Sequence, residues 1–598
     1  MRTEPHRKSL AARLSMPLLV SELSRQATRK RTYAFRVMLI VTTLIAAFSA
    51  LKDVVTVGPP DVVLALGQGK KLFDLLVAIQ YVVTYVFLPA YCSGLITSEK
   101  ERDTLQLLLI TKLSPGSILF EKLLSRLIPF AGLLAVAAPV LAVAYSYGGI
   151  THSMIWCTAY LGLLAAAQVS AIAMLCSVWF RRTVTAFVAT YLLGSALLWF
   201  GPLMVVGKRS GWMWLHCPFY HQLSIMENHG PEAAFVGSWP IWLTTMGMML
   251  IARLILVRRA FVKPSNLLKQ TFQQVDKSVE AVTGTQLRDD STIPVVEPIA
   301  WRETTRGLLG NTRYQLYSLA VVSALVLLAF VMTSGEQCRD MLVQMQTFGF
   351  AIGVLLIAAK GSSLFSQERA SQTLDVLLAI PISNRVLMLQ KFRGLRNLIA
   401  VLTVVYLLLA GLYACAMSTQ LHWEADSQMM NVPFFGLSHL STLVIYPQVI
   451  AWLSICVGMR IRRVLVALLV VLLLLATWCV LPLAVHQWLA SPWGRQASMW
   501  TVWNAQSPLL IPMTYFRQDY KIWDAPWMLL GFNILYFGTW WYVFRRLALA
   551  QLTKHLGRTD GGAESKPVHS SGRSVTQPDV DGVLAVPVEP FASPDVGV

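Results

Sequence analysis

One set of polar residues, at a spacing that would allow them to act together, occurs twice in this chain. The segment Ser93–Lys122 matches Ser362–Lys391 without a gap, and the matches include a glutamate, a Thr-Leu pair and a lysine. The identical positions are Ser93, Leu95, Glu99, Thr104, Leu105, Leu108, Leu109, Ser114 and Lys122 in the first copy and Ser362, Leu364, Glu368, Thr373, Leu374, Leu377, Leu378, Ser383 and Lys391 in the second. Leucines recur easily in an apolar chain, but charged and hydroxyl side chains in one register indicate a duplication. Each copy lies between two long apolar runs, which predicts a polar connector between two membrane spans.

Each connector is predicted to form a short amphipathic helix. Leucines at i, i+3 and i+4 follow Glu99 in the first copy and Glu368 in the second, which places them on one helix face. We therefore expect helices over residues 99–113 and 368–382, with an acidic first turn that suits the helix dipole and a proline at the end. Two helices that only rest on lipid are the alternative, and the matched Glu, Thr-Leu and Lys argue against it.

The composition predicts a membrane protein with many spans. Of 598 residues, 55% are hydrophobic and 14% are charged, and the mean hydropathy is +0.56. An ordinary soluble domain is about 25% charged, and a membrane span needs roughly 20 apolar residues. Runs that meet or approach this length centre on residues 37–57, 73–96, 127–149, 154–179, 184–206, 236–257, 316–334, 342–365, 397–417, 436–458, 464–485 and 525–544. The expected fold is all-α and polytopic, with about 12 transmembrane helices as a parallel tandem repeat of six-helix units.

The basic charge is interpreted as membrane topology. The net charge is +19, and Lys and Arg gather between alternate pairs of spans, as the positive-inside rule describes. Examples are the pairs Arg181–Arg182, Arg258–Arg259, Arg462–Arg463 and Arg545–Arg546. We therefore expect both termini and both connectors in the cytoplasm, the chain in a cell (cytoplasmic or inner) membrane, and no nucleic-acid partner. The first apolar run is interpreted as a signal anchor.

Cysteines and histidines give no indication of a metal centre. The eight cysteines are scattered, without a C-x-x-C pair, and are typical of small buried hydrophobes. His216, His221 and His229 share a loop with Glu227, but at no recognised ligand spacing. We expect no metal site and no catalytic or cofactor-binding residue, so the chain is not expected to be an enzyme.

The duplication extends beyond the connectors. Pro17–Tyr33 resembles Pro298–Tyr314, and both mix apolar and basic residues before a span, which suits a helix in the membrane interface. The aromatic segments 207–235 and 486–524 are expected to form short helices in the outer leaflet, or aromatic belts. The expected domains are a cytoplasmic N-terminal segment with an interfacial helix (1–36), a first six-span half (37–257), a cytoplasmic linker with a second interfacial helix (258–315), a second six-span half (316–546) and a disordered cytoplasmic tail (547–598).

The connector pattern resembles a known signature. The pattern E-x-x-x-x-T-L-x-x-L-L, followed by a break and by a lysine that opens the next span, is similar to the cytoplasmic motif of type-2 ATP-binding-cassette (ABC) transporter permeases. In that family the motif forms a coupling helix that docks into the ATPase subunit. The resemblance assigns ATPase coupling to Glu99, Thr104, Leu105, Leu108 and Leu109, and to Glu368, Thr373, Leu374, Leu377 and Leu378. The family often has Gly before Thr-Leu, where this chain has Asp103 and Gln372.

The resemblance implies a fused permease of an ABC transporter, and export is expected because the family mostly exports. The chain has no G-x-x-x-x-G-K-[ST] phosphate loop, so ATP and Mg²⁺ are expected in partner subunits, two cytoplasmic ABC ATPases. Membrane lipid and an unknown transported substrate complete the expected partners, and lipid, polysaccharide, peptide, drug and ion all remain open as substrates. A stand-alone secondary transporter with an ion-coupling site near the midplane is one alternative. A membrane enzyme or scaffold of a cell-surface or respiratory complex is another.

Overall fold

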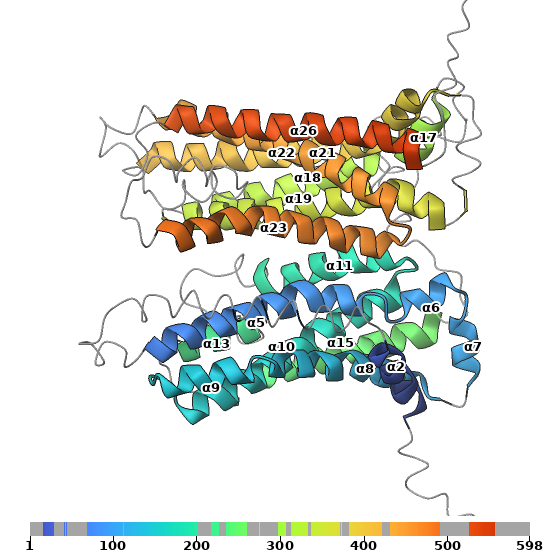
Figure 1. Cartoon of the computed structure of the whole chain (residues 1–598), viewed down its shortest axis with the longest axis vertical. Coiled ribbons are helices and arrows are strands. Elements are labelled where there is room, and N and C mark those ends of the chain that lie inside the picture. The colour runs from blue at the N-terminus through green and yellow to red at the C-terminus, as the bar shows by residue number, and fades with distance from the viewer. Residues whose placement is uncertain are drawn as a thin grey trace, which may run out of the picture. The chain divides into compact units, whose positions relative to one another are not determined.

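The arrangement of the helices comes from a computed structural model (Figure 1). It describes residues 16–28, 68–111, 113–200, 217–226, 235–259, 297–305, 312–332, 336–370, 372–373, 382–420, 431–490 and 526–555, with the single positions 37, 41, 44 and 274. All of them belong to one compact unit, Met1–Arg558. Every element among these residues is helical, which confirms the all-α class predicted from the apolar runs.

The elements up to residue 259 are called the N-terminal set. They are α2 (Pro17–Ala27), α5 (Gln68–Cys92), α6 (Thr97–Glu101), α7 (Leu105–Ile110), α8 (Pro115–Ala135), α9 (Ala138–Ser146), α10 (His152–Trp179), α11 (Thr183–Ser195), the π-helix η1 (Ala196–Phe200), α13 (Pro218–Met226) and α15 (Trp239–Arg259). Helix α10 packs against α5, α8, α11, α13 and α15, so it forms the centre of this set.

The third predicted span, 127–149, is interrupted between α8 and α9. Pro139 lies at the start of α9, where it lacks the N–H that would bond to the preceding turn and its ring crowds that turn. A carbonyl close to the break is satisfied from another helix, because Gln80 Nε2 in α5 donates to Leu134 O at 3.3 Å. This polar residue of a span therefore makes an interhelical hydrogen bond at a kink.

The elements from residue 297 onward are called the C-terminal set. They are α17 (Pro298–Thr305), α18 (Thr312–Met332), α19 (Glu336–Ala370), α21 (Asn384–Gln420), α22 (Asn431–Arg460), α23 (Val464–Ala490) and α26 (Pro526–His555). Helices α19 and α22 approach closely through small residues. A Cβ at Gly458 would lie 2.5 Å from Ser362 O, and a Cβ at Gly361 would lie 2.8 Å from Ser454 Cβ. Small residues at crossing points allow this close packing of membrane helices.

The predicted spans from 73–96 onward coincide with these helices as far as they are described, and the first, 37–57, lies almost entirely outside the described residues. Within the described residues, six helical segments are long and apolar enough to cross a membrane: Gly69–Glu101, Pro115–Ser146, His152–Trp179, Phe235–Arg258, Met345–Ala370 and Asn384–Leu412. Four shorter apolar helices among the same residues are Thr183–Leu198, Gln315–Leu328, Val444–Arg460 and Val464–Cys479.

Helix α13 lies within the first predicted aromatic segment, 207–235. Most of the second, 486–524, lies outside the described residues.

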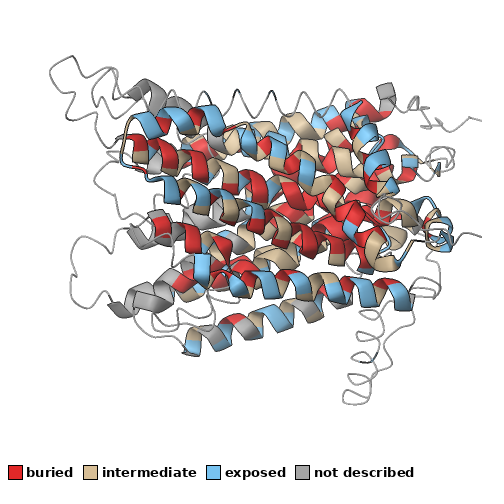
Figure 2. Ribbon diagram, turned by 90° about the horizontal axis from the view of Figure 1, so that it is seen from below, coloured by how far each residue is buried: buried red, intermediate tan, exposed pale blue. Residues whose placement is uncertain are grey.

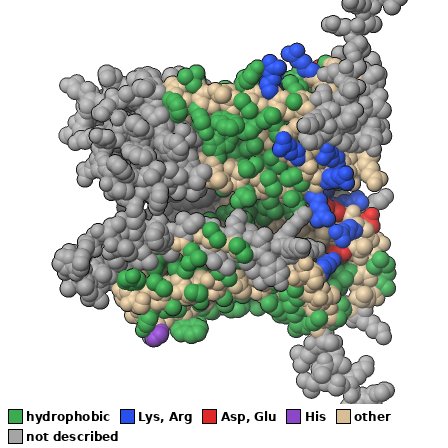
Figure 3. Space-filling view, in the orientation of Figure 1, with side chains coloured by type: hydrophobic (Ala, Val, Ile, Leu, Met, Phe, Trp, Pro, Cys, Tyr) green, Lys and Arg blue, Asp and Glu red, His purple; other side chains and the backbone are tan. Residues whose placement is uncertain are grey.

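The outer faces of the helices are apolar. Buried residues concentrate where helices pack together, whereas exposed residues run along the outward faces (Figure 2). Large apolar side chains on these faces include Trp156, Val331 and Leu535, which are 74%, 75% and 72% exposed. Soluble proteins rarely expose apolar surface of this extent, so these faces fit contact with lipid. Lys and Arg side chains gather toward the end of the helices at which α6, α7 and α17 lie (Figure 3).

The two sets meet at α11, which packs against α19 and α23. We call this contact the seam. Phe187 and Val188 of α11 are buried there in one apolar cluster with Ala358 and Ala359 of α19 and Leu468 of α23. The seam therefore places the first turns of α11 and α23 beside each other.

Helices α2 and α17 lie where the two interfacial helices are predicted, and they pack on α8 and α21 respectively. The start of α2 is held by a carboxylate, because Leu18 N and Leu19 N donate to Glu121 Oε2 of α8 at 3.0 and 3.2 Å. Helix α17 lies close to the α21 backbone at Gly394, where a Cβ would come within 3.1 Å of Glu303 O. Each interfacial helix is thus fixed to the helix that follows a connector.

Candidate functional site

The first connector is not the single helix over 99–113 that periodicity predicts, so that prediction is wrong. Helix α6 ends at Glu101, the chain turns at Asp103, and α7 runs from Leu105 to Ile110. Asp103 has a φ of 55°, and the turn is closed by Thr104 N donating to Glu99 O at 2.9 Å and Asp103 N donating to Lys100 O at 3.3 Å. This bond pattern is that of a helix C-cap with one left-handed residue, a position that glycine usually occupies.

The second connector has the same turn at its start. Gln372 also has a φ of 55°, Thr373 N donates to Glu368 O at 3.0 Å, and Gln372 N donates to Arg369 O at 3.4 Å. Among the described residues, Asp103 and Gln372 are the non-glycine residues with positive φ. They stand where the resembling family often has glycine, which gives that position a physical reason. Leu374, Leu377 and Leu378, with most of the predicted helix 368–382, lie outside the described residues.

The matched Glu, Thr and Lys form one cluster in the first copy. The Glu99 carboxylate accepts hydrogen bonds from Thr104 Oγ1 and, at 3.0 Å, from Lys122 Nζ of α8. The Lys122 side chain is 3% exposed, so it depends on this carboxylate for neutralisation. The cluster joins the end of α6, the start of α7 and α8.

The same cluster occurs in the second copy. The Glu368 carboxylate accepts a hydrogen bond from Thr373 Oγ1 and lies 3.5 Å from Lys391 Nζ of α21. The Lys391 side chain is fully buried. The fixed register of Glu, Thr and Lys in the sequence thus corresponds to three side chains in contact, in each copy.

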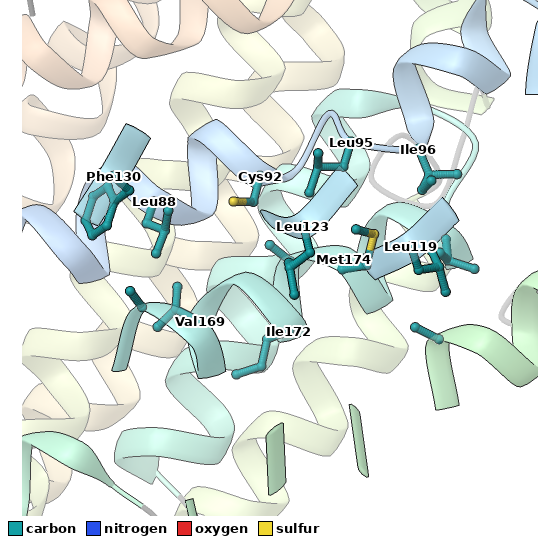
Figure 4. Close-up of a cluster of buried hydrophobic side chains, with 14 of the residues drawn as sticks. Leu88, Cys92, Leu95, Ile96, Leu119, Leu123, Phe130, Val169, Ile172 and Met174 are labelled. Carbon is teal, nitrogen blue, oxygen red and sulfur yellow. The ribbon is translucent and has the colours of Figure 1, made fainter. Parts of the chain in front are cut away.

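The matched leucines of α7 face the protein. Leu105 is buried, and Leu108 and Leu109 pack against the apolar core of the N-terminal set. Figure 4 shows part of this core around Leu95, in the turn after α5, and around Leu119 and Leu123 of α8. The outward side of α7 carries two further apolar side chains. Leu107 is 68% exposed and Ile110 is 76% exposed.

Sequence reasoning missed Leu107 and Ile110 because the i, i+3, i+4 pattern identifies the buried stripe of a helix. The sequence signal that could have identified Leu107 and Ile110 is their position off that stripe, where a helix in contact with water usually carries polar residues. Both residues belong to the short helix α7. The connector therefore presents apolar surface on two sides, one packed and one open.

Helix α6 is also fixed to the junction of α10 and α11. Lys100 Nζ donates to the carbonyl oxygens of Ser177 and Phe180, both at 3.2 Å, and of Val178. Glu101 Oε1 accepts from Thr183 N at 2.7 Å, at the first residue of α11. These side chains satisfy backbone groups that helix ends leave unpaired. The pattern search did not identify Lys100 and Glu101, because the second copy has other residues at their positions.

The second connector is tied to its interfacial helix by charge. Arg302 of α17 lies 3.3 Å from Glu368. Glu303 of α17 lies 3.3 Å from Lys391 and 3.9 Å from Lys360 of α19. Five charged side chains from α17, α19 and α21 thus form one network around the buried lysine.

Among the described residues, the first connector shows no such network. Glu22, the counterpart of Glu303, pairs with Arg25 of its own helix at 2.7 Å. Tyr91 stands where the second copy has Lys360, and its hydroxyl donates to Gln26 Oε1 at 2.5 Å. The two copies therefore share the turn and the Glu–Thr–Lys cluster but differ in how the interfacial helix is attached.

Comparison with known proteins gives one finding. A protein-family model described as ABC-2 family transporter protein matches residues 233–550, a range that contains α15 and nearly all of the C-terminal set. No curated protein matches the chain.

Replacing Gln372 by Gly is expected to stabilise the protein by about 1 kcal/mol, because glycine adopts positive φ without a Cβ clash. The measurement is the thermal unfolding temperature of the purified protein in one detergent. The control is Gln367→Gly inside α19, which is expected to lower stability by about 1 kcal/mol or more. A fall of equal size for both variants would contradict the left-handed turn.

Replacing Lys391 by Met is expected to destabilise the protein by roughly 3 kcal/mol, because two largely buried carboxylates lose their shared cation but keep Arg302 and Lys360 as partners. Lys122→Met should have a smaller effect, since the single carboxylate it leaves, Glu99, is 24% exposed. Adding Glu303→Gln to Lys391→Met should restore part of the loss. Unfolding measurements in which Lys122→Met is the more damaging change would refute this ranking.

Proposed function

This chain belongs to the ABC-2 transporter family, and from that premise we propose that it is a fused permease driven by separate ABC ATPase subunits through its two connectors. Membership of the family makes the chain a multi-pass membrane component of an ABC transporter rather than an enzyme. The observation that carries the proposal is that the family's motif residues build the same fixed turn and the same Glu–Thr–Lys cluster twice.

The first connector is built to transmit a displacement. Helix α7 is joined to α6 by a closed turn, and α6 is joined to α8 through the ion pair of Glu99 and Lys122. Helix α6 is in turn bonded to the end of α10 and the start of α11. A force applied to α7 therefore reaches several helices without passing through a flexible joint.

The second connector transmits force by a different set of contacts. Glu368 and Lys391 join α19 to α21, and Arg302 and Glu303 add α17 to the same charge network. A displacement of this connector therefore also moves its interfacial helix. We therefore propose that the movements of the two ATPase subunits are coupled unequally to the N-terminal and C-terminal sets of helices.

The docking surface that we propose on the first connector is the exposed pair Leu107 and Ile110. Their matched neighbours Leu105, Leu108 and Leu109 face inward and anchor the helix. Full burial of a Leu or Ile side chain stabilises a contact by about 1.5–3 kcal/mol, so this pair could contribute several kcal/mol to binding an apolar groove. In this role the buried stripe positions α7, and the exposed pair contacts the partner.

The proposed arrangement of the chain in the membrane follows from the sequence analysis. Two six-span halves, 37–257 and 316–546, form a parallel tandem repeat, with an interfacial helix before each and the linker 258–315 between them. The connectors and both termini are assigned to the cytoplasmic side of the cell membrane, in keeping with the gathering of Lys and Arg at that end of the helices (Figure 3). Two ATPase subunits supply ATP and Mg²⁺, and export is the direction typical of the family.

The double variant Leu107→Glu with Ile110→Glu is expected to lose most of the binding and stimulation of the partner ATPase, because two charges would enter an apolar contact. ATPase activity and co-purification in detergent are the measurements. Val20→Glu is the matched control, because Val20 is an equally exposed apolar residue (66%) on the neighbouring interfacial helix α2. Normal ATPase binding and stimulation in the double variant, with a folded permease, would refute docking on α7.

A further inference from the structure

Two arginine pairs stand at the starts of equivalent helices. Arg181–Arg182 directly precedes α11, and Arg462–Arg463 directly precedes α23. All four side chains are exposed. The two pairs lie at matching positions of the sequence repeat. They are not part of the connector turns or of the charge networks described above.

The seam brings these pairs to one place. Phe187 and Leu468, each close to the start of its helix, are buried in the same apolar cluster. The first turns of α11 and α23 therefore lie at the same end of the seam, and each arginine pair precedes its helix at that end. Arg369, in the last turn of α19, adds a further cation to this surface, since the charge of Arg462 acts on it.

The positive charge at this end of the seam exceeds the negative charge of the acids beside it. Within the part of the chain that the structure describes, no carboxylate forms an ion pair with the four arginines or with Arg369. Glu101 places one carboxylate at the start of α11, where it accepts a hydrogen bond from Thr183 N, and Glu303 pairs with Lys360 and Lys391. A surplus of positive charge remains on the four arginines and Arg369. Like charges held together in this way favour an anion between them.

Exposed apolar side chains lie on both sides of the seam, on helices that lead away from the arginines. On α5, which is joined to α11 by a hydrogen bond from the Tyr191 hydroxyl to Val86 O, Val82 and Val86 are 59% and 47% exposed. On α23, Leu473 and Leu474 are 43% and 44% exposed. A ligand that fits this surface has an anionic head and an apolar tail.

We propose that this surface, the arginine pairs with the adjoining apolar faces of α5 and α23, binds an anionic phospholipid at the end of the seam. The guanidinium groups bond the phosphate of the headgroup, for which their planar donor fork is suited, and the acyl chains lie along the exposed valines and leucines. A lipid at this position bridges the two sets where they meet. The inference does not depend on ATPase docking.

The test uses the purified full-length chain in detergent with phosphatidylglycerol or phosphatidylcholine added, and measures bound lipid by native mass spectrometry. The wild-type chain should retain phosphatidylglycerol in preference to phosphatidylcholine. The variant Arg182→Gln with Arg463→Gln should weaken phosphatidylglycerol binding by about tenfold or more, since it removes one arginine from each pair. Thermal unfolding of this variant should remain close to wild type, because both side chains are exposed.

The control variant is Arg545→Gln with Arg546→Gln, which removes the same charge from the C-terminal part of α26, where the two guanidinium groups lie over Trp541 and Tyr542. It should retain phosphatidylglycerol nearly as well as wild type. Equal losses in the two variants would overturn the proposal in favour of general surface charge. Equal retention of the two lipids by the wild-type chain would also overturn it, as would displacement of phosphatidylglycerol by millimolar inorganic phosphate, which would indicate a site for a soluble anion.

Discussion

Two buried lysines constrain the part of this structure on which the functional account depends. Lys122 and Lys391 sit near the starts of α8 and α21 with almost no exposure, and a buried ammonium group is tolerated only beside an anion. Each obtains its carboxylate from the end of the preceding connector, Glu99 or Glu368. The same carboxylate binds the hydroxyl of the threonine that follows the turn. A single charged group thereby fixes the direction of the chain between two spans.

This constraint gives the repeated motif a physical meaning. The glutamate supplies the anion, and its backbone carbonyl accepts the hydrogen bond that closes the turn. The threonine donates its backbone N–H to that carbonyl and its hydroxyl to the carboxylate, and the lysine anchors the next helix. The turn requires one left-handed residue, and Asp103 and Gln372 occupy that position without the freedom of glycine. The protein tolerates the strained backbone of these two residues because the surrounding hydrogen bonds hold each turn in this conformation.

The features of this fold that could be predicted from sequence are those set by composition and register. Apolar runs gave the helices, and the shared register of Glu, Thr and Lys identified three side chains that lie in contact. The break at Asp103 could not be predicted from periodicity, because the leucines on both sides of it keep a helical spacing. The kink at Pro139 and the charge network of Arg302 and Glu303 depend on which helices pack together, and a single sequence does not specify that.

The central claim is that separate ATPase subunits drive this permease through the two connectors. The most direct test is to purify the tagged chain from its native membrane in mild detergent and to identify the co-purifying proteins by mass spectrometry. The account predicts a soluble ATPase with a phosphate-binding loop, at close to two copies per chain. A chain that purifies alone, or only with proteins that bind no nucleotide, would contradict it.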